Sequence, residues 1–262
     1  MMSIHIENLW FRYPDTEKHI IKSFSWKKEN PGTIGLLGTN GSGKTTLLKL
    51  IAGIISPLKG EILIENKPLK KKELKKRIVF VPENARLFLI GPTPRKDLNR
   101  IIKKQPEVNE LINQYGFSHL ADKKLYHLSE GQRRIVALFH SFQVPSQFIL
   151  LDEPTVGLDS KGRRLLFHLL KKAKELGKIV FVSTNDSRVF SQMDELIVIR
   201  HGTLFTNGSP KKVLFELERN TELIPNQIIR LITALEDELN KKIPHILTTD
   251  EFNQLLANGR LF

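Results

Sequence analysis

The sequence predicts an α/β fold with a mostly parallel sheet, and three observations support this prediction. Short apolar runs of strand length recur along the chain, and helical patterns separate several of them. A glycine-rich turn also follows one of these runs and leads toward a helix. The apolar runs are Thr33–Leu37, Glu61–Ile64, Ile78–Val81, Phe148–Leu151, Ile179–Ser183 and Leu196–Ile199.

The first elements are predicted to be two strands and a helix. Apolar and polar residues roughly alternate over Ile4–Phe11, which is the pattern of a half-buried strand. Thr33–Leu37 is expected to form a short buried strand that ends in the glycine-rich turn. The helix that follows this turn should begin near Lys44.

The clearest helix in the sequence is predicted over Ser160–Leu176. Leucines and an alanine recur at helical spacing along one face, and Gly177 supplies a stop signal. This helix should follow the strand at Phe148–Leu151, as expected for a parallel sheet with helical crossovers.

Two further regions contain helical patterns and no strand pattern. Between about Glu83 and Phe142 we predict a helical insertion into the α/β core. From about Glu216 the composition shifts again, and the step Ile243–Pro244 splits two amphipathic patterns. These patterns are Gln227–Leu239 and Thr249–Leu256. The predicted organisation is a main domain over residues 1–215, with its helical part at about 83–142, and a small helical extension over residues 216–262.

The composition describes a basic, globular chain without cysteine. Lys and Arg number 41 against 28 Asp and Glu, for a formal net charge of +13, while 40% of the residues are hydrophobic. The absence of Cys excludes disulfides, thiolate metal sites and a cysteine nucleophile. No apolar run reaches the ~20 residues of a membrane helix, and the start MMSIHIENLW lacks a secretory signal, so we expect neither a membrane span nor export by that route. The positive charge suggests an anionic partner, either nucleic acid or a lipid surface. The alternative is a basic surface that binds no such partner.

The glycine-rich turn carries a phosphate-binding motif. The pattern G-x-x-x-x-G-K-[ST] is met after a predicted strand and before a predicted helix, which is the context that such a loop needs. Its glycines allow the backbone to wrap around phosphates, Lys44 can reach the terminal phosphates, and the Thr45 hydroxyl can ligate Mg²⁺. The residues are Gly38, Thr39, Asn40, Gly41, Ser42, Gly43, Lys44, Thr45 and Thr46.

A pair of carboxylates follows the buried strand predicted at Phe148–Leu151. Asp152 and Glu153 lie at the carboxyl end of that strand, where ligands bind in α/β sheets. Asp152 is suited to hold Mg²⁺ through water, and Glu153 to orient or deprotonate the water that attacks a phosphoanhydride. The sequence therefore predicts phosphoanhydride hydrolysis.

The segment Leu128–Arg134, here called the signature segment, reads LSEGQRR. Together with the phosphate loop and the Asp152–Glu153 pair it resembles the ATP-binding-cassette (ABC) ATPases, whose signature LSGGQ appears here as LSEGQ. The resemblance implies a P-loop NTPase fold with an antiparallel β subdomain and a helical insertion, and ATP and Mg²⁺ as cofactors. It also implies a head-to-tail dimer in which Ser129, Gly131 and Gln132 of one subunit contact the ATP held by the other.

Two further positions match the family by their place in the chain. Tyr13 occupies the place of the aromatic side chain that stacks on adenine, although a tyrosine in a strand is also a common core residue. Gly157-Leu158-Asp159 resembles the loop that joins the two sites across the dimer, which implies a place for Asp159 at the nucleotide.

Two positions depart from the family pattern. The family has a Gln that ligates Mg²⁺ after the strand at Ile78–Val81; one alignment puts Glu83 in that role, and another puts Val81 there. The family also has a His that contacts the γ-phosphate, where this chain has Asn185. Asn can donate a hydrogen bond but cannot be cationic, and loss of one preorganised donor costs about 10²–10³ in rate. We therefore expect slow hydrolysis at this chain's own site.

Within the family, the chain most resembles the ATPase of energy-coupling-factor importers of vitamins or of cobalt and nickel ions. The resemblance lies in the start FRYPDTEKHIIKSFSW, the turn GTLFTNGSPKKVLFE and the tail at Ile224–Pro225 and Ile246–Glu251. It implies an integral membrane transporter subunit as partner, a second ABC ATPase in a homo- or heterodimer with the heterodimer favoured, and a position at the cytoplasmic face of the membrane. The transported substrate and the direction of transport stay open.

Three alternatives stay open beside this interpretation. The chain could energise another type of importer or exporter, and the tail is the sequence feature against it. An ABC protein that acts on nucleic acid or ribosomes would suit the net charge of +13, but Lys44 and Ser129 lie too close in sequence for the long coiled coil of the chromosome-maintenance relatives. No nucleic-acid partner is therefore expected. A regulatory module with negligible hydrolysis is disfavoured by the presence of Glu153.

Overall fold

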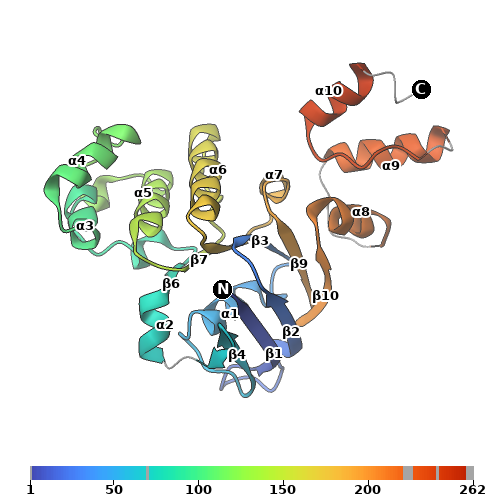
Figure 1. The fold of residues 1–262 in the computed structure, drawn as a ribbon, viewed down its shortest axis with the longest axis horizontal. Helices are drawn as coiled ribbons and strands as arrows, with labels where there is room; N and C mark the ends of the chain where they lie inside the picture. Colours follow the sequence, from blue (N-terminus) through green and yellow to red (C-terminus); the bar gives the residue numbers. More distant parts are fainter. Residues whose placement is uncertain (1, 69–70, 221–226, 240–241, 258–262) are drawn as a thin grey trace.

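The strands of the protein form two sheets (Figure 1). The structure is a computed structural model, and it describes residues 2–68, 71–220, 227–239 and 242–257. One sheet has six strands in the order β10-β9-β3-β8-β7-β6, and the other has four in the order β2-β1-β4-β5. The strands are β1 (Ile4–Phe11), β2 (Ile21–Lys28), β3 (Gly32–Leu37), β4 (Lys59–Ile64), β5 (Lys67–Pro68), β6 (Ile78–Val81), β7 (Phe148–Asp152), β8 (Ile179–Ser183), β9 (Glu195–Arg200) and β10 (Thr203–Gly208).

The six-stranded sheet is parallel except at one edge, which confirms the predicted fold class. Strands β6, β7, β8, β3 and β9 run parallel, and β10 pairs antiparallel with β9. Every residue of β3, β7 and β8 is buried, because layers of the protein cover both faces of a parallel sheet. The carboxyl ends of β3, β6, β7 and β8 meet at one edge, where α/β proteins place their ligands.

The four-stranded sheet is antiparallel and contains β1, which confirms the strand predicted from alternation over Ile4–Phe11. The run Glu61–Ile64 also forms a strand, β4, but it pairs antiparallel with β1 rather than joining the parallel sheet. Periodicity identifies a strand without identifying its sheet. No sequence pattern indicated β2 or β10, whose polar residues interrupt the apolar run that marks the buried strands.

The helices surround the parallel sheet. Between β6 and β7 lie α3, α4 and α5, and residues 83–142, all of them described, contain no strand, as expected for a helical insertion. The helices are α1 (Lys44–Ile51), α2 (Lys71–Arg77), α3 (Pro94–Ile101), α4 (Gln105–Gln114), α5 (Glu130–Gln143), α6 (Ser160–Glu175), α7 (Ser187–Phe190), α8 (Pro210–Asn220), α9 (Gln227–Leu239) and α10 (Thr249–Ala257), with single 3₁₀ turns η1 (Ala85–Leu87) and η2 (Leu125–His127). In the part of the chain that the structure describes, no helix is both long and apolar enough to cross a membrane.

Two hydrophobic cores lie on opposite faces of the parallel sheet, because successive strand residues point to opposite sides. Phe181 of β8 belongs to the core shared with α1 and the antiparallel sheet. Its neighbours Val180 and Val182 belong to the core shared with α5 and α6. Ile229 of α9 and Ile246 join this second core, so the C-terminal helices are packed against the rest of the chain.

The C-terminal helices lie far from the helical insertion in Figure 1. Lys211 of α8 and Glu251 of α10 form an ion pair of 2.7 Å. The tail residues Ile224–Pro225, on which part of the sequence resemblance rests, lie outside the described residues. The boundaries at residues 215 and 216 stay a prediction.

Candidate active site

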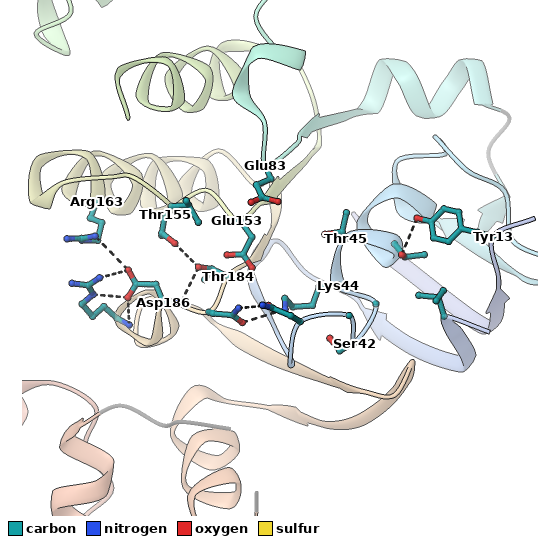
Figure 2. Close-up of a pocket in the computed structure, with 18 residues that line it drawn as sticks. Tyr13, Ser42, Lys44, Thr45, Glu83, Glu153, Thr155, Arg163, Thr184 and Asp186 are labelled. Carbon is teal, nitrogen blue, oxygen red and sulfur yellow. Dashed lines mark hydrogen bonds and ion pairs between the residues drawn. The ribbon is translucent and has the colours of Figure 1, made fainter. Parts of the chain in front are cut away.

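A cleft of about 1140 Å³ lies at the carboxyl edge of the parallel sheet. Figure 2 shows Lys44 and Thr45 between Tyr13 on one side and Glu153 on the other. The structure thus brings together residues from distant parts of the chain. The predicted residues that line the cleft are Tyr13, Asn40, Gly41, Ser42, Gly43, Lys44, Thr45, Thr46, Glu83, Glu153 and Asn185.

The phosphate loop connects β3 to α1 as predicted. Gly43 has φ +112° at the start of α1, a conformation that other residues rarely adopt, and no side chain caps the helix. A Cβ built on Gly41 would meet no atom within 4 Å, so this part of the loop faces open space. The buried Ser42 hydroxyl has no hydrogen-bond partner. The loop therefore offers unsatisfied polar groups at a helix start, which suits a bound phosphate.

Lys44 is held at the centre of the loop. Its Nζ donates to the carbonyl of Gly38 at 2.7 Å and of Thr39 at 3.4 Å, which places these two predicted residues behind the cleft wall. Burial lowers the pKa of the Lys44 ammonium, while the carboxylates of Glu153 and Asp152 act in the opposite direction. Lys44 is thus a buried cation aimed at the cleft with acidic neighbours.

The side-chain oxygens of Thr45, Asp152 and Glu83 form a candidate metal-binding set. The Thr45 hydroxyl donates to Asp152 Oδ1 at 3.0 Å, and the Ser183 hydroxyl donates to the same oxygen at 2.6 Å. Glu83 is exposed and lines the cleft, whereas Val81 is buried within β6. Hydroxyl and carboxylate oxygens are the ligands that Mg²⁺ prefers, so Thr45, Asp152 and Glu83 fit that ion. The geometry favours Glu83 over Val81 for the alignment left open by the sequence.

Glu153 has an unusual backbone for a residue with a side chain. Its φ is +47°, and its N–H donates to the carbonyl of Ser183 at 2.8 Å. Burial raises the pKa of the Glu153 carboxyl, with smaller and opposing effects from Lys44, which lowers it, and Asp152, which raises it. A carboxyl with a raised pKa beside a cleft suits a general base.

Asn185 and Tyr13 both line the cleft, from different elements of the fold. Asn185 accepts from Lys44 Nζ at 3.5 Å and donates to Asn40 Oδ1 at 3.2 Å, so its amide joins the loop after β8 to the phosphate loop. The Tyr13 hydroxyl lies 3.4 Å from Thr46 Oγ1, and its ring packs edge-on against Phe11. Tyr13 is half-buried, so one side of the ring remains open to the cleft.

Seven predicted residues do not line this cleft. Gly38, Thr39 and Asp152 lie directly behind it, bonded to Lys44 or Thr45, whereas Ser129, Gly131, Gln132 and Asp159 lie elsewhere. Ser129 caps α5: it accepts from the backbone of Gln132 at 3.2 Å, and its own N–H donates to the Gln132 side chain at 3.0 Å. Asp159 caps α6 by accepting from Gly162 at 2.7 Å. A Cβ on Gly131 would lie 2.7 Å from the carbonyl of Gly157, so the signature segment packs closely on the loop that leads to Asp159. Ser129 and Asp159 are exposed.

Sequence reasoning missed several residues of the cleft. Thr155 and Thr184 follow β7 and β8, and their buried hydroxyls are 2.7 Å apart. Asp186 binds Arg188 with a shortest distance of 2.7 Å and lies 3.9 Å from Arg163. The threonines adjoin predicted strand ends, which was a usable signal. Arg163 was interpretable only as part of a helix, and no local pattern indicates its contact with the cleft.

Comparisons with known proteins agree with this geometry. A family model described as ABC transporter matches residues 21–156. The energy-coupling factor transporter ATP-binding protein EcfA of Methanocaldococcus jannaschii is 32% identical, over 98% of each chain. The structure of CbiO1 from Clostridium perfringens, part of the ABC transporter complex CbiONQ, has a TM-score of 0.70 and 27% identity, over 88% of this chain and 98% of that one. A dimeric ATP-binding cassette in a post-hydrolysis state with ADP and Pi has a TM-score of 0.70 and 26% identity, over 79% and 98%.

Proposed function

This chain belongs to the ATP-binding proteins of ABC transporters, and from that premise we propose that it energises an energy-coupling-factor type importer by binding and hydrolysing ATP. The observation that carries the proposal is the cleft itself. Lys44, Thr45 and Glu153 line the cleft, and Asp152 lies directly behind it in a hydrogen bond with Thr45, although more than a hundred residues separate Lys44 from Glu153. Resemblance to EcfA supports the importer type.

Different residues of the cleft bind the adenine, bind the phosphates and take part in hydrolysis. Tyr13 stacks on the adenine, and the amides of the loop from Gly38 to Thr46 surround the phosphates. Lys44 neutralises the terminal phosphates with its buried ammonium. Glu153 takes the proton from the attacking water, and Asn185 donates one hydrogen bond toward the γ-phosphate.

Mg²⁺ belongs to this proposal because the donor set fits it. Thr45, Asp152 and Glu83 would hold the ion, with Asp152 acting through water. When bound, Mg²⁺ supplies positive charge that stabilises the phosphate oxygens during transfer. Glu83 adds a negative charge at this place.

A second subunit completes each site in the proposed arrangement. Ser129, Gly131, Gln132 and Asp159 lie outside their own chain's cleft, which supports a role for them at the cleft of a partner ATPase. ATP binding would close the dimer and hydrolysis would reopen it. Because Asn185 weakens one site, we propose a heterodimer in preference to a homodimer.

The dimer would drive a separate membrane subunit that selects the vitamin or metal ion. We propose that this chain lies at the cytoplasmic face of the membrane and that its helical insertion, at about 83–142, passes the motion on. The extension over residues 216–262 would help the two ATPases to associate. Ile229 and Ile246 anchor it to the main domain, residues 1–215.

The test is purification of the tagged chain from detergent-solubilised membranes. We expect a hydrophobic transporter subunit and a second ABC ATPase to co-purify, and the complex to hydrolyse ATP. A matched Glu153→Gln version should recover the same partners without hydrolysis. Recovery with ribosomes or DNA, in a complex that dissociates steeply as salt is added, would contradict the transport function.

A further inference from the structure

Arg134 of α5 connects three parts of the protein that take part in the proposed reaction. Its two terminal nitrogens donate to backbone carbonyls, Nη1 to Glu153 at 2.6 Å and Nη2 to Glu83 at 2.7 Å. These carbonyls follow β7 and β6, which are neighbours in the sheet. The guanidinium therefore binds α5, the helix that the signature segment begins, to the two loops that carry the cleft carboxylates.

The setting of Arg134 is costly for a side chain that only packs. The side chain is 7% exposed, and its Nε has no hydrogen-bond partner. The nearest carboxylate is Glu130, 3.8 Å away and half-exposed. A buried charge needs close compensation, and here two neutral carbonyls supply most of it. The planar fork of an arginine fits two separate acceptors, which a lysine cannot match.

The backbone of Glu153 gives this contact a chemical role. A left-handed conformation, φ +47° here, is unfavourable at a residue other than glycine and persists only where its surroundings fix it. The N–H of Glu153 is fixed by Ser183, and its carbonyl is fixed by Arg134. With both sides of the residue held, the direction of its carboxylate into the cleft depends on Arg134.

We propose that Arg134 is a positioning residue that sets Glu153 and Glu83 in the cleft according to the position of α5. The inference rests on the proposed function, in which α5 presents Ser129 to the partner's nucleotide. Movement of α5 at that second site then displaces the carboxylates of this chain's own site. Arg134 thereby couples the two sites of a dimer within one chain.

Arg134→Lys and Arg134→Gln test the proposal. The lysine variant keeps the positive charge, and the glutamine variant keeps a planar group with N–H donors. Displacement of a catalytic group by about 1 Å costs roughly 100-fold in rate. We expect the isolated chain, in which no second ATPase contributes turnover, to lose about this factor in kcat, with the KM for ATP unchanged. His140→Gln is the matched control, because His140 is buried on the same helix but binds Asp97 of α3 instead. We expect it to retain kcat within a few-fold.

A double-mutant cycle separates positioning from general stability. In a Glu153→Gln background, the substitution at Arg134 should cause a much smaller further loss in single-turnover rate, because only Glu83 is then left for Arg134 to position. Wild-type kcat in either folded Arg134 variant would overturn the proposal, as would a loss that multiplies with that of Glu153→Gln. Failure of both variants to fold would assign Arg134 a purely structural role and also contradict it. Absence of hydrolysis in the wild-type complex would instead contradict the proposed function.

Discussion

The phosphate loop and the signature segment both lie at the start of a helix, but the two starts are built differently. At α1 the residue before the helix is Gly43, which offers no side-chain cap. At α5 Ser129 and Gln132 satisfy each other's backbone groups in a capping box. The first helix start is left open for a ligand within its own chain.

The second helix start is complete without a ligand, yet it keeps one group available. The Ser129 oxygen accepts from Gln132, and a hydroxyl that accepts still has a hydrogen to donate. Ser129 is exposed and lies outside the cleft. The difference supports the proposed division, in which the chain binds phosphates at the start of α1 and presents the start of α5, already capped, to a partner.

The largest effect on the hydrolysis rate is expected from a change in the cleft, at Glu153. Glu153→Gln keeps the shape of the side chain and removes the base, so the hydrolysis rate should fall by about 10³. ATP affinity, which depends on the phosphate loop, should be retained. Steady-state hydrolysis and nucleotide titration of the isolated chain, without the partner ATPase, measure the two. A loss of affinity equal to the loss of rate would show that Glu153 acts in binding.

Asn185→His should have the opposite effect and raise the hydrolysis rate. The amide now joins Lys44 to Asn40, and an imidazole could add a cationic donor at the γ-phosphate. We expect the rate of the isolated protein to rise by about 10². Asn185→Gln, which adds length without charge, is the control and should leave the rate low. Equal, fast turnover in wild-type and His proteins would reject the idea of a slow site.

The sequence predicted the cleft better than it predicted what surrounds it. The loop from Gly38 to Thr46 and the pair Asp152–Glu153 are local patterns at strand ends, so their convergence follows from a parallel sheet. Arg163 and Arg134 reach the site from helices that are distant in the sequence, and no local spacing encodes that contact. The sheet to which Glu61–Ile64 belongs was likewise decided by pairing with β1, not by its own residues.

A smaller effect on the hydrolysis rate is expected from a change at Ser129, at the start of α5. Ser129→Ala removes one hydrogen bond to a charged phosphate and should lower the hydrolysis rate about tenfold in a dimer. Binding of ATP to the separate subunit should not change, because Ser129 lies outside that cleft. Lys44→Ala should instead abolish this binding.

Mixing these two variants without the partner ATPase tests whether the sites are shared in dimers formed by copies of this chain. In a mixed dimer, Lys44 of the Ser129→Ala chain meets Ser129 of the Lys44→Ala chain and forms one intact site. Hydrolysis by the mixture should therefore exceed that of either variant alone. No gain, despite demonstrated mixed dimers, would contradict a site shared between chains.

The smallest effect near neutral pH concerns the two buried charges of the cleft. Burial raises the pKa of Glu153, so the carboxylate that acts as base is lost on acidification at a higher pH than an ordinary glutamate would be. Burial lowers the pKa of Lys44, so its ammonium is lost sooner as the pH rises. The change near pH 7 should be about twofold, steepening toward tenfold per unit below the pKa of Glu153. A profile of kcat against pH measures both limbs, and the acid limb should vanish from the residual rate of Glu153→Gln. Its persistence there would assign the limb to another group, because Glu83 and Asp186 in the cleft and Asp152 behind it are unchanged in that variant.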